Sequence, residues 1–220
     1  MAVLTEKQIK YGFDYYHKDE KRIKSVVEVS EYDGEDKLII NCTQLDEDYS
    51  AKDKKRILQE WCSFLVEHPD IFTELMFCTR MPQELFDAVC AQRRLKRLHI
   101  KWGVYPDILK LENLQELEYL HIGSGRSVSS LEPISRLVNL VALSIENFQQ
   151  IDDYAPLTNL KHLESLALEG DFASPKILKV RSLGFLRHMK QLCFFSFLTA
   201  KVTDKDYSPI LELNNLEHLR

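Results

Sequence analysis

A leucine pattern recurs along the second half of the chain and constrains its fold more than any other feature. The motif L-x-x-L-x-(I/L/F) begins at Leu95, Leu117, Leu140 and Leu163, returns in altered form at Leu192, and starts again at Leu216. Successive starts lie 22, 23, 23, 29 and 24 residues apart. One unit of this length cannot bury its apolar row alone, so the units must stack on one another. The pattern therefore predicts a solenoid.

A second block precedes three of these starts. It reads SLEPISRLVNL at 130–140, DYAPLTNLKHL at 153–163 and DYSPILELNNL at 206–216, with Pro seven residues before the first motif Leu each time. Proline fixes φ at the start of a short helical or 3-10 turn, whose leucines then point inward. The chain next extends as a strand, in which alternate side chains face the same way. We therefore expect a parallel sheet on the concave face and short helices or 3-10 turns on the convex face.

The repeat core Pro-(Leu/Ile)-x-x-Leu-x-x-Leu-x-x-Leu-x-Leu resembles that of bacterial leucine-rich-repeat proteins with internalin-like repeats. The resemblance covers about residues 93–220, with a weaker echo from residue 72, and it implies an α/β leucine-rich-repeat solenoid. This chain departs from the pattern three residues beyond the strand, where such repeats usually have Asn. The residues there are Gly103, Gly125, Phe148, Asp171 and Ala200. We therefore expect the asparagine ladder to be missing or replaced by bound water, in an irregular and less rigid solenoid.

Residues 1–70 lack the repeat and predict an α+β capping region, followed by a leucine-rich-repeat domain at 71–220. Residues 26–29 and 37–40 flank Asp33-Gly34, which predicts a hairpin. Apolar residues at helical spacing predict a helix over 51–68, ended by Pro69, and a second helix is expected over 83–92. A solenoid needs a polar cap over its first unit. The alternative is a small functional domain fused to the repeats, although no recognisable site lies there.

Composition excludes several classes of partner. The formal charge is -5, with 34 acidic and 29 basic residues spread along the chain, so no basic tract offers a nucleic-acid footprint. No window approaches the roughly 18 uncharged apolar residues of a membrane-spanning helix, and the N-terminus lacks the features of a secretory signal.

The five cysteines are odd in number and without CxxC spacing. We read them as reduced thiols in a cytoplasmic protein.

No standard catalytic or cofactor-binding motif is present, so we expect no enzyme, no catalytic residues, no metal and no cofactor. The sequence predicts a noncatalytic protein–protein interaction scaffold that binds a protein partner on the concave sheet. Two alternatives stay open. In the first, the chain is a regulatory or inhibitory subunit of an enzyme. In the second, it is a small enzyme that uses its N-terminal region.

Residues between the motif leucines point out of the sheet and form the candidate binding surface. The predicted contact residues are Arg97, His99, Lys101, Trp102, Tyr119, His121, Glu146, Glu169 and Phe194. The first six are basic or aromatic and are the preferred contact for an acidic segment of a partner, because Trp, Tyr and Arg dominate binding hot spots. The alternative is that they are ordinary solvated strand residues.

Two pairs in this set occupy equivalent positions on neighbouring strands. His99 and His121 would lie roughly 5 Å apart and could bind a metal or sense pH, but two hydrated imidazoles are favoured because no third ligand is evident. Glu146 and Glu169 carry like charges that repel each other side by side on a sheet. Either a cationic group of a partner binds them, or the two side chains turn away from each other into solvent.

The sequence reaches only one residue past Leu219, inside a repeat strand. An open parallel edge tends to pair with another strand. We expect either a homodimer through this C-terminal repeat edge or a capping segment that follows; a monomer in solution would count against the first.

Overall fold

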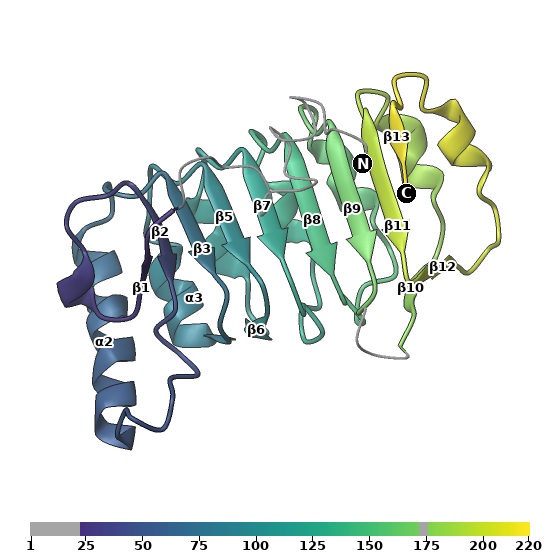
Figure 1. Cartoon of the computed structure of the whole chain (residues 1–220). Coiled ribbons are helices and arrows are strands. Elements are labelled where there is room, and N and C mark those ends of the chain that lie inside the picture. Colours follow the sequence, from purple (N-terminus) through teal and green to yellow (C-terminus); the bar gives the residue numbers. More distant parts are fainter. Residues whose placement is uncertain (1–22, 172–175) are drawn as a thin grey trace, which may run out of the picture.

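The computed structural model describes residues 23–171 and 176–220 (Figure 1). Within them, one parallel sheet runs the length of the molecule in the order β1-β2-β3-β5-β7-β8-β9-β11-β13. Its strands are β1 (Ser25–Val26), β2 (Lys37–Ile40), β3 (Glu74–Phe77), β5 (Arg97–Ile100), β7 (Tyr119–Ile122), β8 (Ala142–Glu146), β9 (Ser165–Glu169), β11 (Phe194–Leu198) and β13 (His218–Leu219).

The central motif leucines form one continuous row inside the sheet. Leu98 pairs in register with Leu120, Leu120 with Leu143, Leu143 with Leu166, and Leu166 with Phe195. Each of these side chains is at most 1% exposed. The predicted leucine-rich-repeat solenoid is therefore confirmed, including the register that the 23-residue spacing implied.

Short helical segments cover the face of the sheet opposite the viewer in Figure 1. They are α3 (Gln83–Val89), η2 (Leu109–Asn113), α4 (Glu132–Ser135), η3 (Ala155–Asn159), η4 (Gly184–His188) and η5 (Ser208–Glu212), where η marks a 3-10 helix. Pro133, Pro156 and Pro209 stand in the first turn of α4, η3 and η5, as their spacing predicted. Proline fits there because the first turn of a helix needs no N–H donor from it.

Main-chain hydrogen bonds fasten the turns that follow the strands. The N–H of Gly125 donates to the Glu146 carbonyl at 2.9 Å, that of Asn147 to Glu169 at 2.8 Å, and that of Gly170 to Leu198 at 2.9 Å. Two short parallel ladders lie beyond the same strand ends, β4 (Met81–Pro82) with β6 (Gly103–Val104) and β10 (Leu178–Val180) with β12 (Ala200–Val202). Backbone amides thus link these turns directly from one repeat to the next, and the replacement of an asparagine ladder by bound water stays a prediction.

Side-chain amides link neighbouring repeats just before the strands. Asn139 Nδ2 donates to the Gln115 carbonyl and Asn215 Nδ2 to the Lys190 carbonyl, each at 2.8 Å. Asn139 and Asn215 both directly precede the first motif Leu of their repeat. The repeats are therefore tied together at both ends of their strands.

The predicted hairpin over residues 26–40 is wrong, because β1 and β2 are parallel. Ser25 pairs with Ile39 and Val26 with Ile40, and β2 in turn pairs with β3. A 3-10 turn, η1 (Val29–Glu31), directs the chain away from a hairpin; the Glu31 carboxylate accepts from the Glu28 N–H at 2.9 Å. The strands of the predicted capping region thus belong to the same sheet as the repeats.

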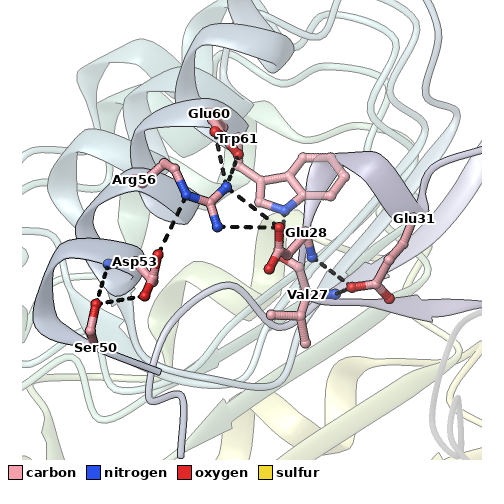
Figure 2. A network of polar contacts seen from close by, with 8 residues as sticks. All are labelled: Val27, Glu28, Glu31, Ser50, Asp53, Arg56, Glu60 and Trp61. Atoms are coloured by element: carbon pink, nitrogen blue, oxygen red, sulfur yellow. Dashed lines mark hydrogen bonds and ion pairs between the residues drawn. The ribbon is translucent and has the colours of Figure 1, made fainter. Parts of the chain in front are cut away.

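Helix α2 (Ala51–Glu67) lies beside α3 at the first end of the solenoid, close to the predicted 51–68 range. Trp61 is fully buried and its Nε1–H donates to the Val27 carbonyl at 2.7 Å. The Arg56 guanidinium contacts Glu60 at 2.9 Å and Glu28 at 3.3 Å, so it ties the helix to the segment after β1 (Figure 2). The first 22 residues of the predicted capping region lie outside the described part of the chain. The division at residue 70 stays a prediction.

Candidate protein-binding site

The outward side chains of the sheet fall into three parallel rows, because neighbouring strands pair without a shift. The first row contains Arg97, Tyr119, Ala142, Ser165 and Phe194, and the second contains His99, His121, Ser144, Ala167 and Ser196. The third row begins at Lys101, directly after β5, and includes the paired Glu146 and Glu169 and then Leu198. All predicted contact residues therefore share this face except Trp102, which follows Lys101 and is half-buried.

Arg97 belongs to a network of contacts between charged and aromatic side chains. Its Nε lies 3.9 Å from Glu74 Oε1, its Cζ lies 5.1 Å from the centre of the Tyr119 ring, and Lys37 Nζ lies 3.6 Å from Glu74 Oε2. Burial raises the pKa of Glu74, and the nearby Arg97 opposes that rise. The basic end of the predicted surface thus carries its own counter-charge.

Glu74 is the residue that the sequence interpretation missed. It is 3% exposed and pairs in register with Arg97, one repeat earlier. The signal was present, since Leu75 and Phe77 repeat the spacing of Leu98 and Ile100.

The two predicted histidines stack on each other, and the expectation of two hydrated imidazoles is wrong for His99, which is only 4% exposed. Their ring centres lie 4.2 Å apart with planes inclined by 6°, and His121 Nδ1 is 2.9 Å from Ser144 Oγ. Burial lowers the pKa of His121 to about 4 and, with the charges of His121 and Lys101, lowers that of His99 well below its usual value. Neutral imidazoles therefore occupy this position near neutral pH. In residues 23–171 and 176–220, no group of three His, Cys, Asp or Glu side chains is placed to hold a metal ion.

Glu146 and Glu169 lie side by side on β8 and β9. Ser196 Oγ donates to Glu169 Oε1 at 2.7 Å. Burial, followed by the charges of Asp171 and Glu169, raises the pKa of Glu146 to about 7. The half-buried Glu146 carboxylate is therefore in an unfavourable environment when it is ionised.

The predicted apolar end of the surface is not an exposed patch. Phe194 is 2% exposed and Tyr119 6%, and both belong to a small apolar cluster with Ala142 and Cys193. The predicted residues that do reach the surface are polar or amphipathic. Lys101 is exposed, while Arg97, Trp102, His121, Glu146 and Glu169 are half-buried.

Over the described ranges, no helix is both long enough and apolar enough to cross a membrane. A scan against protein-family models and a search of curated proteins each gave no match.

Solved structures do show a likeness. Internalin C2 from Listeria monocytogenes aligns with a TM-score of 0.52 and 19% sequence identity, covering 84% of this chain and 67% of its own. A second Listeria monocytogenes internalin, inlF, gives a TM-score of 0.46 at 19% identity, covering 68% of this chain and 54% of its own. A Leptospira interrogans leucine-rich-repeat protein gives a TM-score of 0.25 at 12% identity, covering 84% of this chain and 65% of its own. The alignment with internalin C2, together with the register of the leucine row, shows that the chain has the fold of a leucine-rich-repeat solenoid with internalin-like repeats.

Proposed function

We propose that this protein is a noncatalytic scaffold that binds a protein partner on its concave sheet. The observation that carries the proposal is the pair Glu146 and Glu169, two like charges in direct register on adjacent strands. Like charges directly opposite each other destabilise a sheet, and the pKa of Glu146 is already raised to about 7. A positively charged group of a partner would relieve this repulsion.

The same row suggests what the partner presents. Lys101 is exposed and lies two strands from Glu146, roughly 10 Å away at the usual strand spacing. A segment with a basic side chain over Glu146 and Glu169 and an acidic one over Lys101 would match both charges.

A regulatory or inhibitory subunit of an enzyme would use this surface in the same way. The identity of a captured partner distinguishes a general interaction scaffold from a regulatory subunit. Only the regulatory subunit requires the partner to be an enzyme whose catalytic rate changes on binding.

The test uses the full chain as bait in affinity capture, followed by a measured Kd for the captured protein. A Glu146→Gln/Glu169→Gln variant removes the charge pair and keeps the side-chain shape. The matched control is Glu116→Gln/Glu132→Gln, which changes two exposed carboxylates outside the sheet face.

We expect the first variant to bind about tenfold more weakly, which corresponds to about 1.4 kcal/mol, and the control to bind as wild type does. Equal affinity for all three proteins, or an equal loss in both variants, would overturn the proposal.

A further inference from the structure

Part of the outward face of the sheet is buried, although a solvated sheet face normally leaves its side chains partly exposed. In the first outward row, four neighbouring residues are at most 6% exposed: Tyr119, Ala142, Ser165 and Phe194. The third row is more open, since Lys101 is exposed there and Glu146 is half-buried. Burial is therefore concentrated along the first row, from β7 to β11.

Neighbours within the sheet do not account for this burial. Outward side chains stand roughly perpendicular to a sheet, so neighbours in a row cover one another's sides and leave the tips open. Ala142 and Ser165 are small and lie between Tyr119 and Phe194, whose strands are roughly 14 Å apart. These four residues form a trough, with an aromatic residue at each end and a floor that is only 2% and 4% exposed. Such a floor needs a cover above it.

No described helix or strand lies over this trough. Within residues 23–171 and 176–220, the short helical segments of the repeats cover the opposite face, and α2 lies beside α3 at the first end (Figure 1). The gap at 172–175 opens after Asp171, about 20 Å along the chain from Ser165 at the start of β9. Four residues span at most about 14 Å, so residues 1–22 are the part of this chain that remains to cover the trough.

Residues 1–22 are long enough to reach the whole trough. The described chain begins at residue 23, immediately before β1 at the first end of the sheet. Strand β11 lies seven strand spacings from β1, which is roughly 34 Å. An extended segment of 22 residues spans up to roughly 73 Å.

The sequence of this segment also matches the trough. Residues 10–15 read K-Y-G-F-D-Y, so Tyr11, Phe13 and Tyr15 alternate with small or charged residues. This alternation is typical of an extended strand with one apolar face. Aromatic side chains on that face would fit over the small floor between Tyr119 and Phe194, because ring pairs gain energy beyond the area they bury.

We propose that residues 1–22 bind along the trough as an extended segment, with Tyr11, Phe13 and Tyr15 toward the sheet. The segment thereby withholds Tyr119 and Phe194 from other proteins and acts as an autoinhibitory contact, since aromatic residues are enriched in protein interfaces. The third row stays accessible beside it. The inference is therefore independent of the proposed function, whose test depends on the third row.

Hydroxyl-radical footprinting of the full 220-residue chain tests the proposal, because the oxidation rate of a side chain follows its exposure to solvent. The variant Tyr11→Ser/Phe13→Ser/Tyr15→Ser removes the aromatic face of the segment. The matched control is Lys10→Ser/Asp14→Ser, which changes the other face of the same stretch.

Two reference residues are read in every protein. Tyr207, which is 47% exposed, reports an open site, and Phe148, which is 1% exposed, reports the leucine core. We expect oxidation of Phe194 to be about tenfold faster in the aromatic variant than in wild type or the control, because an open sheet face exposes far more than 2% of such a side chain. Phe148 should stay protected throughout.

A synthetic peptide of residues 1–22, added in excess to the aromatic variant, should restore the protection of Phe194, and a scrambled peptide should not. Phe194 as protected in the aromatic variant as in wild type would overturn the proposal. So would an equal rise at Phe148, which would mean that the whole protein loosens, or equal protection by both peptides.

Discussion

Replacing Glu146 by Gln should stabilise the protein above neutral pH and have little effect at acid pH. The pKa of Glu146 rises from 4.5 to about 7 on folding, and each pKa unit corresponds to about 1.4 kcal/mol. The full shift is worth about 3 kcal/mol, and because the side chain is only half-buried, solvent screening reduces the expected effect to about 1–2 kcal/mol.

The sign follows from proton binding. Between pH 4.5 and about 7 the folded protein keeps a proton on Glu146 that the unfolded chain has released. The free energy of unfolding therefore falls as pH rises through this range and is constant above it. Glutamine does not ionise, so this loss disappears in Glu146→Gln.

Urea unfolding of both proteins at about pH 5 and about pH 8 measures the effect, with the slope m checked for equality. The difference between the two proteins cancels the contribution of every other titrating group. Glu132→Gln is the matched control, because it removes one carboxylate at an exposed site outside the sheet face. A stability difference that is equal at both pH values, or larger at pH 5, would refute the reasoning.

Three further predictions concern packing, the links between repeats and the histidine stack. Leu143→Ala should lower the free energy of unfolding by about 2–5 kcal/mol, because this rung is 1% exposed; Val138→Ala, at a 48% exposed site, should change it by less than about 0.5 kcal/mol in the same urea titration. Asn139→Ala removes the bond to the Gln115 carbonyl and should cost about 1 kcal/mol by thermal unfolding, and an unchanged Tm would contradict that role. His121, whose pKa falls from 6.5 to about 4, makes stability decline as pH drops through that range, so His121→Gln should reduce the decline by about 1–2 kcal/mol, and equal pH profiles for both proteins would argue against it.

The fold of the repeat region was predictable because each unit has to bury its motif leucines in the same core. Leu120, Leu143 and Leu166 have to face the same core, so their spacing determined which residues pair across the strands. The segment before β2 was not predictable in this way. Asp33-Gly34 is a valid local turn signal, but β2 extends the buried row with Leu38, which pairs with Leu75, and that long-range contact determines the strand direction.

The candidate site was predictable in its position on the sheet but not in its environment. Alternation along a strand correctly put Tyr119 and Phe194 on the outward face, yet both are buried in a small apolar cluster there. Alternation describes one strand at a time and carries no information on how side chains of different strands cover one another. The neutralisation of Arg97 by Glu74 escaped prediction for the same reason.

The main-chain hydrogen bonds at the turns after β7, β8 and β9 limit how the sequence of this protein can change in evolution. Two of the three donors are glycines that leave no room for a side chain: an added Cβ would lie 2.0 Å from the Phe148 ring at Gly125 and 2.2 Å from the Thr199 carbonyl oxygen at Gly170. A larger residue at either position would have to displace the neighbouring unit, so the sequence can diverge more freely along the outward-facing rows of the sheet than at these two turns.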